Sequence, residues 1–169
     1  EALYPYPKGL VIATKGGNTR PGPNQWVPDG RPEYLKQCVD KSLKRLKLER
    51  IDLYQLHWPN HDMAIGDTLD VLERLVSEAK IRTYGVSNFG VHDLGDALAS
   101  GRPIASNQLA YNLLFRVIED EILPVTRELG ISITAYGVLS RGLISGHWQK
   151  GQQGAGDFRA VSPRFQEGN

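Results

Sequence analysis

Five apolar segments of the chain each carry, at or near their end, a polar or aromatic residue that could take part in chemistry. These are Lys15 in "LVIATK", His57 in "IDLYQLH", Ser87 and Asn88 in "IRTYGVSN", Asn107 and Gln108 in "IASNQLAYN", and Tyr136 in "ISITAYGVL". A lysine at the end of an apolar strand is either a solvated terminus or a reagent, for example the nucleophile of a Schiff-base aldolase.

Segments with a helical period separate these apolar runs. Apolar residues recur on one face in Leu35–Leu46, Leu69–Ala79 and Val91–Leu98, and in a weaker stretch from about Glu119 to Leu129. Pro32 suits the first turn of the first helix, and Asp29 is a possible cap upstream of it. Strands that alternate with helices predict βαβ units and a parallel sheet.

Units of roughly thirty residues suit either a doubly wound open sheet or an eight-stranded barrel. No "GxGxxG" follows the first strand, so the dinucleotide-binding version of the open sheet lacks its main support. In both folds the chemistry lies at the carboxyl ends of the strands, because the loops converge there. The candidate residues therefore share one edge of the predicted sheet.

Each candidate also has a structural explanation. Lys15 can be a solvated terminus, His57 beside Trp58 can be a structural histidine, and the "SN" pair can cap a helix. All five segments nevertheless carry such a residue toward the same end. This coincidence favours a functional site over five unrelated structural roles.

The composition is that of a folded domain without a bulk electrostatic partner. The 169 residues are 40% apolar, with 20 basic and 19 acidic side chains, so we expect no nucleic-acid and no membrane partner. A single cysteine, Cys38, excludes an intrachain disulfide and favours a reducing compartment, which we take to be the cytoplasm. His61, His92 and His147 lack ligand-like spacing, so we predict no metal site.

The strand-end motifs resemble those of the aldo-keto reductases. "ATKGG", "IDLYQLHWPN", "RTYGVSNF", "SNQLAYN" and "TAYGVLSRGLISG" occur in that family's order and at similar spacing, over nearly the whole chain. The resemblance implies a parallel (β/α)₈ TIM barrel, with about five of the eight βα units present, as strands three to seven. It also implies NADPH-dependent interconversion of aldehydes or ketones with alcohols, on a small-molecule carbonyl substrate.

The same resemblance assigns roles to individual residues. It implies that Lys15 and His57 are catalytic, with a neutral histidine donating to the carbonyl oxygen and the lysine cation lowering the pKa of a proton-donating tyrosine. The residues that correspond to the family's binding site for NADPH and NADP⁺ are Ser87, Asn88 and Gln108 at the nicotinamide amide, Tyr136 beneath the ring, and Val138, Leu139, Ser140 and Arg141 along the pyrophosphate.

The family's tyrosine and its aspartate partner are not recognisable in this sequence. Both belong before the strand that carries Lys15, and Tyr4 and Tyr6 lie in "EALYPYPKG" without the family's "D-x-A-x-x-Y" pattern. The family's last strand would follow Asn169. We therefore expect residues 1–169 to be a single aldo-keto reductase-like barrel domain that is incomplete at both ends, and inactive as an isolated piece.

Two alternatives to catalysis by a carbonyl reductase stay open. The same fold serves in some relatives as a cofactor-binding regulatory subunit of an ion channel, and a Schiff-base barrel aldolase is a third hypothesis. The Gly- and Pro-rich stretch 16–31 is long enough to be a functional lid. Trp26 in this stretch and Trp58 beside His57 are the candidates for substrate-pocket walls. The sequence does not indicate an oligomeric state.

Overall fold

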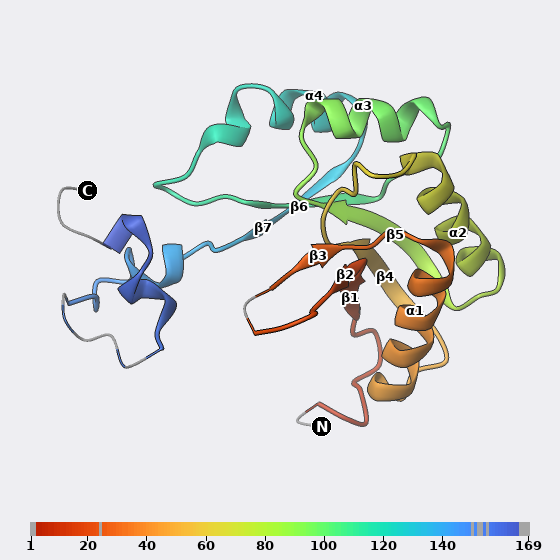
Figure 1. Ribbon diagram of the computed structural model, residues 1–169, viewed down its shortest axis with the longest axis horizontal. Helices are drawn as coiled ribbons and strands as arrows, with labels where there is room; N and C mark the ends of the chain where they lie inside the picture. The colour runs from red at the N-terminus through yellow and green to blue at the C-terminus, as the bar shows by residue number, and fades with distance from the viewer. Residues whose placement is uncertain (1–2, 24, 150, 152–153, 155, 166–169) are drawn as a thin grey trace.

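Five parallel strands form the central sheet of the computed structural model, which describes residues 3–23, 25–149, 151, 154 and 156–165 (Figure 1). In their order across the sheet they are β1 (Ala13–Gly16), β4 (Ile51–Leu56), β5 (Ile81–Ser87), β6 (Ser106–Ala110) and β7 (Ser132–Tyr136). Every neighbouring pair is parallel. The predicted parallel sheet is therefore confirmed.

Four helices pack beside the sheet in chain order. They are α1 (Pro32–Leu46), α2 (Ile65–Ser77), α3 (Val91–Ala99) and α4 (Ile122–Glu128). α1 contacts α2, α2 contacts α3, and α4 contacts β7. Figure 1 shows the helices following one another around the outside of the sheet, as successive βα units do in the wall of a barrel. None of the described helices is both long and apolar enough to cross a membrane.

Short 3-10 turns connect the remaining segments. They occupy Val117–Glu119, Ser140–Gly142, Phe158–Ala160 and Pro163–Phe165. The hydrophobic core lies between the sheet and the helices that cover it. Its fully buried side chains include Leu35 of α1, Tyr54 of β4, Leu72 of α2, Tyr84 of β5 and Leu94 of α3. Burying an apolar side chain of this size contributes about 1.5–3 kcal/mol, so the covered face of the sheet is the stable part of the fold.

The first strand is shorter than the apolar run that predicts it. β1 begins at Ala13, whereas Leu10 and Val11 precede it and are 41% and 61% exposed. Ala13 pairs with Leu53, and β4 begins only two residues earlier, at Ile51. No ladder can therefore extend to Leu10, and the sequence-based start of this strand was wrong. The start of α1 at Pro32 was right.

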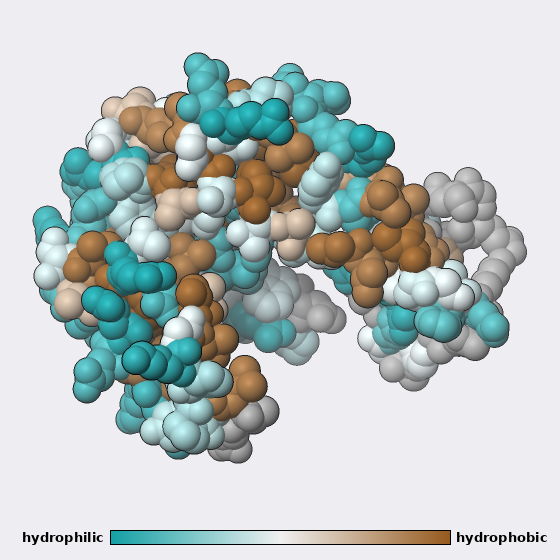
Figure 2. Space-filling view, turned by 180° about the vertical axis from the view of Figure 1, so that it is seen from behind, coloured by the Kyte–Doolittle hydropathy of each residue, from teal (hydrophilic) through white to brown (hydrophobic). Residues whose placement is uncertain are grey.

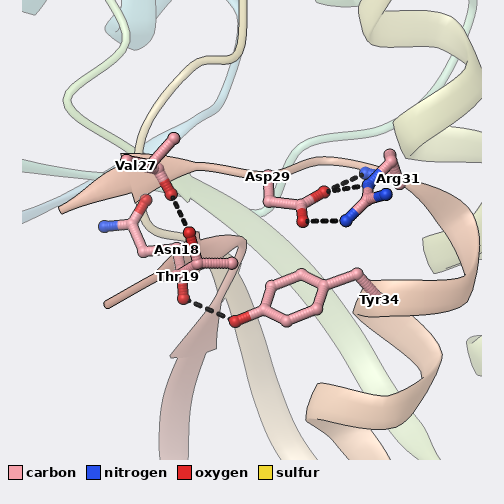
Figure 3. Close-up of polar contacts among 6 residues, drawn as sticks. All are labelled: Asn18, Thr19, Val27, Asp29, Arg31 and Tyr34. Atoms are coloured by element: carbon pink, nitrogen blue, oxygen red, sulfur yellow. Dashed lines mark hydrogen bonds and ion pairs between the residues drawn. The ribbon is translucent and has the colours of Figure 1, made fainter. Parts of the chain in front are cut away.

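The Gly- and Pro-rich stretch 16–31 contains a small antiparallel hairpin of β2 (Asn18–Thr19) and β3 (Val27–Pro28). The Thr19 hydroxyl donates to the Val27 carbonyl at 3.3 Å, and the Tyr34 hydroxyl of α1 donates to the Asn18 carbonyl at 2.6 Å (Figure 3). The hairpin is therefore tied both across its own strands and to the helix that follows it.

Asp29 anchors the end of this hairpin instead of capping α1. The N-cap of α1 is Arg31, which makes no side-chain capping bond. The Arg31 guanidinium donates to both Asp29 carboxylate oxygens, at 2.9 and 2.7 Å, and the Arg31 amide donates to one of them (Figure 3). The predicted capping role was wrong, because the carboxylate reaches the arginine amide rather than the second or third amide of the helix.

We expect Asp29→Asn to lower the free energy of unfolding by about 1 kcal/mol at pH 7, a modest effect because Arg31 is well exposed. Hydrogen bonds from Arg31 hold the pKa of Asp29 below its usual value. A carboxyl with a depressed folded-state pKa stabilises the fold above its unfolded pKa and loses this effect as the pH falls through the folded pKa. The unfolding free energies of wild type and variant, measured in urea, should therefore begin to converge as the pH falls below about 4 and should coincide only below the folded-state pKa of Asp29.

Arg31→Gln removes the same ion pair by changing its other member, and this variant is the matched control. If the pair acts as described, the double variant should be no less stable than the worse single variant. Fully additive single effects would show that Asp29 acts through other contacts.

Both edges of the central sheet are open among the described residues. β1 and β7 are its edge strands, and the segments that follow β6 and β7 expose apolar side chains. The residues more than half exposed there are Leu113, Leu114, Val117, Val138 and Leu139. Figure 2 shows apolar surface where the body of the molecule faces the C-terminal segment that stands apart from it. A closed barrel has no such edges, so this sheet is an open wall of five strands.

Candidate active site

Lys15 and His57 lie side by side on neighbouring strands. Lys15 pairs with Gln55 in the β1–β4 ladder, and the amide of His57 donates to the Gly16 carbonyl at 2.9 Å. Because side chains alternate along a strand, Lys15, Gln55 and His57 point to the same face. Gln55 is buried beneath them, where its amide donates to the Ser106 hydroxyl at 3.2 Å.

The surroundings of His57 favour its neutral form, and Lys15 has no counter-ion among the described residues. Burial lowers the pKa of His57, and the nearby charge of Lys15 lowers it further. Burial also lowers the pKa of Lys15, and no carboxylate pairs with this lysine in the part of the chain that the structure describes. At neutral pH the site therefore presents an uncharged imidazole, which can donate a hydrogen bond, beside an ammonium group that is only partly hydrated.

The two glycines after Lys15 serve different needs. Gly17 has a φ of +90°, a conformation that favours glycine, and this allows the chain to turn into the hairpin. Gly16 has an ordinary φ but no room for a side chain, since a Cβ there would lie 1.8 Å from the Tyr54 hydroxyl. The strand end that carries Lys15 is thus packed directly on Tyr54 of β4.

A chain of hydrogen bonds joins the ends of β4, β5, β6 and β7. The Tyr136 hydroxyl donates to Asn88 Oδ1 at 2.9 Å, and Asn88 Nδ2 donates to the His57 carbonyl at 3.1 Å and to the Ser87 hydroxyl oxygen at 3.0 Å. Ser87 in turn donates to the Gln108 carbonyl at 3.0 Å. Five of the residues implied by the family resemblance are therefore linked at this edge of the sheet, with His57 and Gln108 contributing backbone carbonyls.

Asn88 is held in a conformation that few residues adopt. Its φ is +63°, in the left-handed region that asparagine tolerates better than most side chains. The following helix, α3, has its N-cap at Gly90, whose amide donates to Asp93. The structural alternative for the "SN" pair, a helix cap, is therefore wrong. The backbone turn at Asn88 instead directs its amide back toward the strand ends.

A second asparagine fixes this turn from below. Asn107 of β6 is fully buried, and its side-chain amide donates to the Phe89 carbonyl at 2.8 Å and accepts from the Phe89 amide at 3.4 Å. Asn107 therefore supports the loop that follows β5, and its side chain is fully buried, so it presents no exposed group to a ligand. Gln108 contributes its backbone carbonyl to the network, while its side chain is half-buried.

Two pockets at this edge of the sheet are lined by residues of the predicted site. The first, of about 420 Å³, is lined by Asn18, Trp26, Pro28, His57 and Trp58. The Trp26 and His57 rings meet at 61° with their centroids 6.4 Å apart. Both tryptophans named as pocket candidates therefore line one cavity with His57. Asn18 was missed, since nothing in its sequence position signals that the hairpin turns it toward this cavity.

The second pocket lies at the ends of β6 and β7. It has a volume of about 450 Å³, and its lining includes Tyr136, Gly137 and Arg141 together with Asn112 and Phe115. Tyr136 is 39% exposed, so part of its side chain is accessible from this pocket. Of the other residues implied for the pyrophosphate, Val138 and Leu139 are exposed and Ser140 is fully buried.

Comparison with known proteins gives one family. The model of the aldo/keto reductase family matches residues 1–163. Probable aldo-keto reductase 1 of Glycine max is 36% identical over 170 residues, covering 100% of this chain and 49% of that protein. Aldo-keto reductase YhdN of Bacillus subtilis is 38% identical over 145 residues, or 85% of this chain and 44% of that protein. The chain thus spans about half the length of the curated relatives it matches.

Solved structures agree with this assignment. The glycerol dehydrogenase AKR11B4 of Gluconobacter oxydans superposes with a TM-score of 0.89 at 36% identity, over 99% of this chain and 53% of that one. An aldo/keto reductase of Klebsiella pneumoniae, in complex with NADP and acetate, superposes with a TM-score of 0.66 at 27% identity, over 80% of this chain and 45% of that one. The five-stranded sheet therefore corresponds to part of a (β/α)₈ barrel, and the chain belongs to the aldo-keto reductase family.

Proposed function

We propose that the protein interconverts aldehydes or ketones with alcohols by exchanging hydride with NADPH or NADP⁺. The observation that carries this proposal is the neutral His57 beside the unpaired cation of Lys15, at the mouth of a pocket and next to a network of amide, hydroxyl and phenol groups. Reduction of a carbonyl needs such groups, because negative charge develops on the oxygen as the carbon accepts hydride.

His57 and Lys15 have separate tasks in this proposal. The neutral imidazole donates a hydrogen bond to the carbonyl oxygen and holds it toward the strand ends. The Lys15 ammonium favours the anionic form of a nearby tyrosine and so brings its pKa toward the working pH, which makes it an effective proton donor. Tyr6 is not suited to this task, because its hydroxyl donates to the Leu46 carbonyl at the end of α1. We expect the tyrosine and its aspartate partner to come from sequence outside residues 1–169, which would then be one incomplete barrel domain.

The strand-end network fits a nicotinamide cofactor. Ser87 and Asn88 offer the hydroxyl and amide groups that suit a carboxamide, with Gln108 beside them, and Tyr136 offers a partly accessible aromatic side chain for a planar ring. Gly137 and Arg141 line the adjacent pocket, where the residues from Val138 to Arg141 would follow a pyrophosphate. When bound, the cofactor supplies the hydride. These residues orient it so that one face of the ring meets the substrate pocket. The single half-buried Cys38 supports a reducing compartment such as the cytoplasm.

The test uses the full-length product of the gene and two measurements. Quenching of protein fluorescence should report NADPH binding, and loss of NADPH absorbance should report reduction of benzaldehyde. We expect His57→Ala to lower kcat/KM by about 10²-fold, because it removes a donor to the developing oxyanion. His92→Ala, an exposed histidine of α3, is the matched control and should retain activity.

Each outcome distinguishes between hypotheses. Tight NADPH binding without turnover of any carbonyl compound would favour the cofactor-binding regulatory subunit. Turnover that His57→Ala leaves unchanged would show that another group activates the carbonyl oxygen. Absence of NADPH binding in the full-length protein would overturn the proposal.

A further inference from the structure

The β2–β3 hairpin turns one of its two faces toward the pocket beside His57. Asn18 pairs with Pro28 and Thr19 pairs with Val27. Paired residues of an antiparallel ladder share a face, and successive pairs alternate between faces. Asn18 lines the pocket with His57, Thr19 and Val27 line a different cavity, and Pro28 borders both.

Arg20 and Trp26 come directly after β2 and directly before β3, and Trp26 lines the pocket. Each lies two residues from Asn18 or Pro28, so a continued alternation puts both on that side of the hairpin. The interaction between them is direct, since the Arg20 guanidinium carbon lies 4.2 Å from the Trp26 ring centroid. Trp26 in turn meets the ring of His57 edge to face. Trp26 therefore contacts both the Arg20 guanidinium group and the His57 imidazole, which is proposed to hold the carbonyl oxygen.

Stacking on Trp26 fixes Arg20 without using its hydrogen-bond donors. A guanidinium group over an indole ring keeps all five N–H groups available in its plane. No carboxylate pairs with Arg20 in the described ranges of the chain, and the acidic residue at the base of the hairpin, Asp29, has both oxygens bound to Arg31 (Figure 3). The pocket lining contains no acidic residue either.

The charges around the pocket are thus of one sign. Arg20 stacks on Trp26, which is a wall of the pocket, and the charge of Lys15 acts on His57, which is another. A neutral substrate would gain no binding energy from the positive charge of Arg20. A substrate with a carboxylate at the far end from its carbonyl group would gain a charge-assisted, bidentate pair at Arg20 while its carbonyl oxygen reaches His57.

We propose that Arg20 is a specificity-determining residue that selects carbonyl substrates bearing a carboxylate at the end opposite the reacting carbonyl. The proposal rests on the proposed function and narrows its substrate class. Arg20 and His57 both contact the Trp26 indole, at 4.2 Å and 6.4 Å from its ring centroid, so a substrate that reaches both groups must extend along this one aromatic side chain. A rigid para-substituted benzaldehyde is therefore a suitable probe.

The experiment compares para-formylbenzoate with para-formylbenzamide, which have the same shape and differ in charge. In the full-length protein we expect kcat/KM to be about fivefold higher for the benzoate, and we expect Arg20→Gln to remove this preference. Arg20→Lys should restore part of it, because the charge returns without the planar fork. Raising the salt concentration should weaken the preference in the wild type, since Arg20 is exposed. Arg45→Gln, the same charge change on α1, should leave the ratio unchanged.

Three results would overturn the proposal. They are equal kcat/KM for both aldehydes in the wild type, an equal loss for both in Arg20→Gln, or a raised KM for NADPH as the main effect of that variant. The last result would assign Arg20 to the cofactor. Turnover of neither aldehyde would instead count against the proposed function itself, and the two failures are therefore distinguishable.

Discussion

Replacing Lys15 with methionine is expected to lower kcat/KM for aldehyde reduction by about 10³-fold in the full-length protein, within the range typical of lost acid–base assistance. Methionine fills a similar volume and suits the half-buried site, so folding should be little affected. The loss should fall mainly on kcat, because the lysine cation acts on a proton donor rather than on substrate binding. Lys41→Met, at an exposed position of α1, is the matched control.

The pH profile should change together with the rate. The pKa of His57 is lowered first by burial and then by the charge of Lys15. Removing the lysine removes the second cause, so the pKa of His57 should rise toward its ordinary value. The imidazole would then become charged at a higher pH than in the wild type. We therefore expect the acid limb of the kcat/KM profile of Lys15→Met to shift to higher pH, and the size of this shift measures how strongly the lysine charge acts on His57.

Contrary results would point to the remaining hypotheses. Activity within a few-fold of wild type would make Lys15 a solvated strand terminus. Borohydride trapping of a covalent substrate adduct on Lys15 would instead support a Schiff-base aldolase, because only an amine nucleophile forms a reducible imine.

The order of the strands and the edge that carries the site were predictable from the sequence, because both follow from local patterns. Alternating apolar runs and amphipathic helices determine the βαβ order, and a parallel sheet then brings every carboxyl end to one edge. The start of α1 at Pro32 follows from chemistry within a single helical turn.

Features that depend on distant residues were not predictable in this way. The hairpin strands β2 and β3 have two residues each, too few for a periodic pattern, and contacts from Tyr34 and Arg31 hold them in place. The bond from Tyr136 to Asn88 joins residues 48 positions apart. Arg20 was overlooked for the same reason, because its contact with Trp26 depends on how the hairpin folds back.

A second large effect is expected at Gly16, where alanine should lower the free energy of unfolding by about 3 kcal/mol. A Cβ at this position would lie 1.8 Å from the Tyr54 hydroxyl oxygen, 2.9 Å from the ring carbon that bears it and 3.2 Å from the Cβ of Cys38. Tyr54 is fully buried in the core and cannot swing into solvent, so the strand end itself must move. Chemical unfolding of the full-length variant measures the loss. Gly95→Ala in α3 is the control, since a Cβ there meets nothing within 4 Å.

Tyr54→Phe separates this clash from any other effect of the substitution. The Tyr54 hydroxyl is buried without a hydrogen-bond partner among the described residues, so its removal alone should stabilise the protein by about 1 kcal/mol. In the Gly16→Ala background the same change should recover only part of the lost stability, because the ring carbon stays within 3 Å of the new methyl group. Gly16 also follows Lys15, and its carbonyl accepts a hydrogen bond from the His57 amide. A shift of this strand end should therefore lower kcat/KM by more than the loss of stability alone explains. In the double variant, kcat/KM should recover together with stability. Full stability of Gly16→Ala would show that the packing of this strand end on Tyr54 does not fix the position of Lys15.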